Sequence, residues 1–125
     1  MSGTEGVELL EAVRRFLREQ VLPELDDFKA YHTRVAANAL GIAVREMQMG
    51  AWLAQLDAQI AADLGLDAGA GPVTRQIALA LRDGTLAVDR ELLSWLQKRT
   101  LLAIAIDNPK YSGLQQAKVL WDCAT

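Results

Sequence analysis

The side chains best suited to acid–base chemistry begin with His32, the single histidine of the sequence. Its imidazole could act as a general base, because its pKa is easily moved across neutrality. Helical periodicity places His32 near Ala36, Ala39 and Ala43, on the apolar side of its helix. A buried histidine with one hydrogen-bond partner is the commoner occupant of such a position. We therefore expect a structural role for His32 and rank catalysis by it third among the candidate functions.

Arg34, Asn38 and Arg45 form a polar row on the same expected helix. At 100° per residue they lie within about 40° of one another. Such a row could bind a phosphate or a carboxylate, and the alternative is a solvated helix face. For Arg45 the spacing favours the solvated face, whereas for Arg34 and Asn38 the two interpretations are balanced.

The segment 107–113 (DNPKYSG) is the richest polar stretch of the chain. Asp107 is expected on the inner side of a helix, at its C-terminal end, where the helix dipole opposes a negative charge. We expect Asp107 to pair with Arg34 or His32, and Asn108 to belong to the same structural network. The alternative is a binding site for a phosphate or carboxylate, and its candidate side chains are Arg34, Asn38, Lys110 and Tyr111.

Metal, cofactor and nucleophilic chemistry find little support in the sequence. One histidine and one cysteine do not supply a standard zinc site, and no tight acidic cluster marks a magnesium site. Neither a phosphate-binding loop nor a nucleophile elbow is present. We expect no metal and no cofactor, the catalytic residues are unknown, and the absence of a catalytic constellation argues against an enzyme.

Charge and cysteine content restrict the class of partner. The 125 residues carry a formal net charge of -3, and Glu11 and Glu19 flank the one compact basic group, which is Arg14, Arg15 and Arg18. A solvated helix face explains this group better than a nucleic-acid site does. The single cysteine, Cys123, cannot form an internal disulfide, which indicates a reducing compartment such as the cytoplasm. No segment is apolar for long enough to suggest a membrane span.

Helices must position these side chains. Alanine and leucine supply 20 residues each, against 8 valines and 5 isoleucines, and this balance favours helices over strands. Periodicity predicts helices over about 4–21, 27–49, 51–64, 72–83 and 90–107, with a weaker one over 114–121. The expected helix ends are Pro23, Gly50, Gly65, Gly84 and Asn108, and Asp89 is the expected N-cap of the helix over 90–107.

These elements predict an all-α fold, an up-and-down bundle of four to five helices in one domain over residues 1–125. The core would span about 7–113, and residues 114–125 would form a short C-terminal extension. Ala36, Ala39 and Ala43 should form a flat surface for a close helix contact, and residues 66–71 should form a flexible loop. The inner face of the helix over 90–107 should comprise Leu92, Leu96, Thr100, Ala103 and Asp107. Val119, Leu120 and Trp121 would dock on the core or form a homodimer.

Two segments, 31–40 (YHTRVAANAL) and 106–113 (IDNPKYSG), together with the opening 8–13 (ELLEAV), resemble an uncharacterised bacterial family, domain of unknown function 6285. The resemblance covers about 7–113. It implies a small helical protein often encoded beside acyl-CoA dehydrogenases and aminoglycoside-phosphotransferase-like kinases. It supplies no catalytic residues, and Lys110 replaces the arginine that usually precedes the tyrosine in this family.

The first functional hypothesis is therefore an accessory or protein-interaction module that serves a phosphotransferase-like kinase or an acyl-CoA dehydrogenase. The second is a small-molecule binder that uses Arg34 and Asn38 with the 107–113 turn. An exposed apolar patch without a deep pocket would favour the first, and a concave polar site would favour the second.

Overall fold

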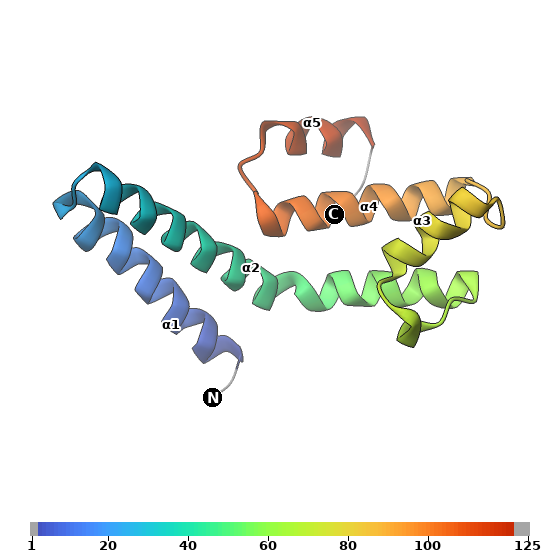
Figure 1. Ribbon diagram of the computed structural model, residues 1–125, viewed down its shortest axis with the longest axis horizontal. Coiled ribbons are helices and arrows are strands. Elements are labelled where there is room, and N and C mark those ends of the chain that lie inside the picture. The colour runs from blue at the N-terminus through green and yellow to red at the C-terminus, as the bar shows by residue number, and fades with distance from the viewer. Residues whose placement is uncertain (1–2, 122–125) are drawn as a thin grey trace. The chain divides into compact units, whose positions relative to one another are not determined.

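The computed structural model describes residues 3–121, and all regular secondary structure in this range is helical (Figure 1). The α-helices are α1 (Gly3–Phe16), α2 (Asp27–Leu64), α3 (Val73–Asp83), α4 (Arg90–Asp107) and α5 (Ser112–Leu120). They confirm the predicted all-α class. Cys123 lies outside the described residues. Within residues 3–121, no helix is long and apolar enough to cross a membrane.

The helix end predicted at Gly50 is wrong, because α2 continues without a break from Asp27 to Leu64. A helix-ending glycine usually adopts a positive φ, and Gly50 is not among the positive-φ glycines Gly65, Gly71 and Gly84. A glycine inside a helix costs only about 1 kcal/mol relative to alanine. The helix-forming residues that follow Gly50 offset this cost, and no proline stops the chain there.

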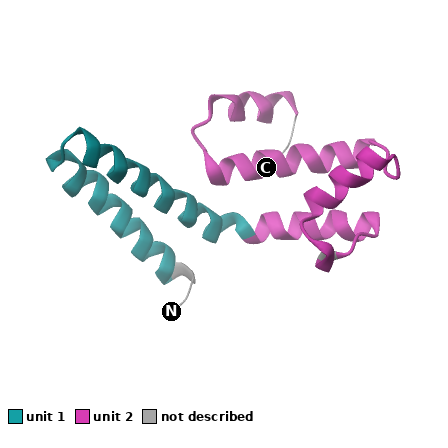
Figure 2. Cartoon of the chain, in the orientation of Figure 1, with its two compact units in different colours: residues 1–50 teal, residues 51–125 magenta. Residues whose placement is uncertain are grey.

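The chain divides into two compact units, residues 1–50 and residues 51–125 (Figure 2). The first unit consists of α1, a π-helical stretch over Leu17–Val21, a 3-10 turn over Leu22–Glu24 and the N-terminal part of α2. The predicted first helix thus changes its winding after Phe16 instead of running regularly to Val21. Pro23 stands in the 3-10 turn, where the chain reverses.

Three residues of α2 are buried in the first unit, and two of them are small. Ala37, Gly41 and Val44 are buried and recur at helical spacing along one side of α2. Ala36 and Ala39, which were expected at the close contact, are exposed, and Ala43 is half-buried. The prediction failed because the apolar arc of this helix is broad, so that periodicity does not select the side that packs against its neighbour.

The core of the second unit is formed by Ile60, Ile77, Leu92 and Trp95. The indole Nε1 of Trp95 donates a hydrogen bond of 3.1 Å to the main-chain oxygen of Leu56. Next to this contact, Arg99 binds both carboxylate oxygens of Asp57 at 2.8 and 3.2 Å. These interactions join α4 to the C-terminal part of α2.

The inner face predicted for α4 is only partly right. Its buried residues are Leu92, Trp95, Leu101 and Ile106. Leu96 and Ala103 are half-buried, whereas Thr100 and Asp107 are exposed. The packed face is therefore rotated away from the predicted stripe.

The helix ends in the second unit follow the predicted signals. Gly65 and Gly84 adopt φ values of 69° and 78°, and the residues after them donate to Ala61 and Ala80 in the pattern of a Schellman motif. The Asp89 carboxylate accepts a hydrogen bond of 2.8 Å from the Leu92 amide, which confirms the predicted N-cap.

The connection over residues 66–71 has local structure of its own. It contains a 3-10 turn at Ala68–Ala70. The side-chain Nε2 of Gln76 donates hydrogen bonds to the main-chain oxygens of Asp67 and Gly71 at 2.8 and 2.9 Å. These two bonds fasten the connection to α3.

The C-terminal extension forms α5, in which Leu114 is buried. Val119 and Leu120 near its end are exposed, so these two side chains do not dock on a core of the described chain.

Candidate functional site

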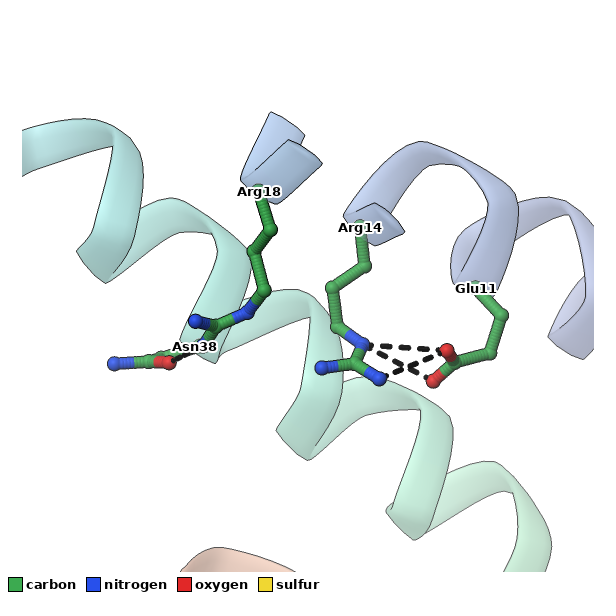
Figure 3. A network of polar contacts seen from close by, with 4 residues as sticks. All are labelled: Glu11, Arg14, Arg18 and Asn38. Atoms are coloured by element: carbon green, nitrogen blue, oxygen red, sulfur yellow. Dashed lines mark hydrogen bonds and ion pairs between the residues drawn. The ribbon is translucent and has the colours of Figure 1, made fainter. Parts of the chain in front are cut away.

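The predicted polar row on α2 is contacted by Arg18 of the π-helical stretch that follows α1 in the first unit. Asn38 is exposed, and its side-chain oxygen accepts a hydrogen bond from Nη2 of Arg18 (Figure 3). Arg34 and Arg45 lie within about 40° of Asn38 around the helix axis. The three residues therefore share the side of α2 that Arg18 reaches, and Arg18 is a site residue that sequence reasoning assigned to a solvated face.

A second arginine, Arg14 of α1, is paired with a carboxylate. Nε and Nη2 of Arg14 donate to the two oxygens of Glu11 at distances of 3.0 to 3.3 Å (Figure 3). This hydrogen bonding, joined by the charges of Arg14, Arg15 and Arg45, outweighs partial burial and holds the pKa of Glu11 below its ordinary value. Glu11 therefore remains ionised at neutral pH.

Gly41 provides the room for these long side chains. A Cβ atom at this position would lie 3.1 Å from Nη1 of Arg45 and 3.6 Å from Cδ of Arg14. The stem of Arg14 and the tip of Arg45 thus converge above a buried backbone position. We call the set Glu11, Arg14, Arg18, Asn38, Gly41 and Arg45 the arginine seam.

Arg18 has a buried donor without a hydrogen-bond partner in the arginine seam. Its Nε atom is buried and has no hydrogen-bond partner, although Nη2 of the same guanidinium is bonded to Asn38. A buried donor without a partner costs free energy, and it is uncommon in proteins.

A second feature of the first unit is a group of exposed apolar and aromatic side chains on α2. Phe28 and Tyr31 are 73% and 60% exposed. The His32 ring lies against both, with ring centroids 4.6 Å from Phe28 and 5.4 Å from Tyr31. Val35, one turn further on, is also exposed. We call Phe28, Tyr31, His32 and Val35 the aromatic patch.

The predicted burial of His32 is wrong, because its side chain is exposed. The residues that α2 buries against α1 begin at Ala37, which lies about 180° from Phe28 around the axis. The aromatic patch therefore occupies the side of α2 turned away from α1. His32 makes ring contacts there, and the structure shows no hydrogen bond to its imidazole from a described residue.

The 107–113 turn belongs to the second unit. Asn108 caps α4, with its amide 2.7 Å from the Ile104 oxygen, and its own oxygen accepts from the Tyr111 amide at 3.0 Å. The Asp107 and Lys110 side chains are exposed, and within the second unit they make no hydrogen bond or ion pair. The Tyr111 ring covers Gly113, because a Cβ there would lie 2.6 Å from it.

His32, Arg34 and Asn38 belong to the first unit and the turn to the second. The pairing of Asp107 with Arg34 or His32 stays a prediction, as does a joint site of Arg34 and Asn38 with Lys110 and Tyr111.

The second unit contains a pocket of about 240 Å³ between α2 and α4. Leu56, Ile60 and Trp95 supply its apolar wall, and Asp63, Glu91 and Lys98 are its charged lining. No single stretch of sequence signals this pocket, because its two walls lie more than twenty residues apart. Among residues 3–121, no group of three or more His, Cys, Asp or Glu side chains could hold a metal ion.

The fold and these surfaces define a small all-helical protein. The chain belongs to the family described as Domain of unknown function (DUF6285), whose model matches residues 23–111. Comparison with curated proteins and with solved structures gave no match. The match excludes the opening segment 8–13 and the arginines of α1.

Proposed function

We propose that this protein is an accessory protein-interaction module that uses the aromatic patch to bind a partner protein. Two helices bury little apolar surface by themselves, and the fully buried residues of α2 in the first unit are Ala37, Gly41 and Val44. The aromatic side chains lie on the other side, in contact with solvent. Large exposed aromatic residues in one group are typical of protein interfaces and are costly to leave in water.

The partner that we propose is a phosphotransferase-like kinase or an acyl-CoA dehydrogenase, and the setting is the bacterial cytoplasm. The family resemblance implies these two classes, and the single cysteine supports a reducing compartment. The proposed contact is an apolar helix or groove of the partner, laid along Phe28, Tyr31 and Val35 at the i, i+3, i+7 spacing of a helix interface.

The surroundings of His32 support catalysis less well than the aromatic patch supports a binding function. His32 is oriented by aromatic rings, and the structure places no nucleophile or carboxylate in hydrogen-bonding contact with it among the described residues. A general base requires a defined proton path to a substrate. The interaction function needs no such arrangement.

The proposal is tested by titrating the full chain with each candidate partner in a calorimeter. Burial of a phenylalanine contributes about 1.5–3 kcal/mol, so Phe28→Ala should weaken binding by about tenfold or more. The variant should fold normally, since Phe28 is 73% exposed. Val88→Ala changes a similarly exposed apolar residue of the second unit and serves as the matched control.

Equal affinities of the wild type and Phe28→Ala for a bound partner would contradict the role of the aromatic patch. Light scattering on the protein alone tests whether the aromatic patch instead forms a homodimer. A homodimer that Phe28→Ala dissociates would assign the patch to a second copy of this chain and overturn the accessory role.

A further inference from the structure

In the arginine seam of the first unit, the guanidinium group of Arg18 has too few hydrogen-bond acceptors for its donors. In Arg14, Nε and Nη2 both donate to one carboxylate, that of Glu11. In Arg18, the corresponding Nη2 donates to the single amide oxygen of Asn38, while the buried Nε has no partner. Arg14, four residues earlier in the chain, thus shows the two-oxygen acceptor that fits this edge, and Arg18 lacks one.

We propose that the arginine seam is a binding site for a phosphate group. In the proposed complex the phosphate replaces the Asn38 oxygen at Arg18, so that two of its oxygens accept from Nη2 and Nε. Paired, parallel bonds of this kind are the arrangement in which arginine binds oxoanions most strongly. The Asn38 amide is then free to turn and donate its NH₂ group to a third oxygen.

The charge of the seam favours a phosphate over a carboxylate. Arg14, Arg18 and Arg45 carry three positive charges and Glu11 carries one negative charge, which leaves a net charge of +2. A phosphate monoester carries about -1.5 to -2 at neutral pH and offers three acceptor oxygens. A second carboxylate would leave the seam with a net positive charge.

Gly41 lets two cationic side chains of the arginine seam converge. Because residue 41 has no side chain, the tip of Arg45 and the stem of Arg14 lie directly above the helix backbone. Arg45 can therefore contact an anion held at Arg18 from the α2 side, and Arg34, on the same side of α2, adds a further positive charge to the approach. The arginine seam lies within α1, the π-helical stretch after it and the first half of α2, so the site is independent of the aromatic patch and of any partner.

The test is calorimetric titration of the full chain with inorganic pyrophosphate, inorganic phosphate and acetate at neutral pH and low salt. We expect saturable one-to-one binding of pyrophosphate, weaker binding of phosphate and none of acetate. Arg18→Lys keeps the charge and removes the paired donors, and it should weaken pyrophosphate binding by about tenfold. Arg82→Gln, an exposed arginine of α3, should leave the affinity unchanged.

Glu11→Gln provides a test in the opposite direction. Removal of the Glu11 carboxylate frees the Arg14 edge and raises the net charge, so pyrophosphate should bind several-fold more tightly. Absence of saturable binding, an Arg18→Lys affinity equal to that of the wild type, or weaker binding by Glu11→Gln would overturn the proposal. Binding of a short oligonucleotide without binding of pyrophosphate would overturn it in favour of a nucleic-acid surface.

Discussion

Because α2 runs without a break through Gly50, replacing this glycine by alanine should stabilise the protein. Gly50 lies inside the helix without a positive φ, and a Cβ added there would meet only Cγ of Glu46, at 3.6 Å, an ordinary contact. Alanine is favoured over glycine in a helix by about 0.8–1 kcal/mol. Gly50→Ala should therefore raise the free energy of unfolding by up to about 1 kcal/mol.

The matched control is Gly84→Ala. Gly84 ends α3 with φ 78°, and a Cβ there would touch nothing within 4 Å, so only the backbone conformation is affected. A left-handed alanine costs about 1 kcal/mol, which predicts a loss of stability. Urea unfolding followed by circular dichroism measures both variants. Destabilisation by Gly50→Ala as large as that by Gly84→Ala would show that the helix ends at Gly50 and refute the continuous α2.

Other predictions concern single contacts. Asp89→Ala removes the N-cap of α4 and should lower the free energy of unfolding by about 1 kcal/mol in urea titrations. Trp95→Phe removes the bond to the Leu56 oxygen and should cost about 1 kcal/mol or more, measured in the same way. The lowered pKa of Glu11 stabilises the fold above pH 4.5, and this contribution is lost as the pH falls through the pKa of the folded state. Wild type should therefore be more stable than Glu11→Gln at neutral pH, and thermal melts should show the difference shrinking in acid.

Local signals in the sequence predicted most of the helix ends. Gly65, Gly84 and Asp89 were assigned correctly, because a helix end depends on a few neighbouring residues and their backbone angles. Gly50 was assigned wrongly because glycine has only a weak preference against the helix interior. Its φ, which decides between an end and a continuation, is set by the residues around it.

The faces of the helices were harder to predict. The apolar arc around Ala36, Ala39 and Ala43 is broad, and the neighbouring helix packs on the adjoining side instead, over Ala37 and Gly41. The spacing of this arc also misplaced His32 in the interior. Periodicity gives the angle between residues on a helix, and it leaves open which angle points at the neighbour.

The polar contacts between distant residues could not be predicted from the sequence without the tertiary structure. The sequence indicated the row of Arg34, Asn38 and Arg45, and only the folded chain shows that Arg18, in the π-helical stretch after α1, is the partner of Asn38. The Asp57–Arg99 pair joins residues 42 positions apart, so no local motif could reveal it.

Hydroxyl-radical footprinting of Phe28 and Tyr31, with and without a candidate partner, tests the interaction function most directly. Oxidation of aromatic side chains follows their exposure, so both residues should react readily in the free protein. They should become protected in the complex, whereas Tyr111, 52% exposed in the second unit, should keep its rate. Protection of Tyr111 with unchanged oxidation of Phe28 and Tyr31 would contradict binding through the aromatic patch.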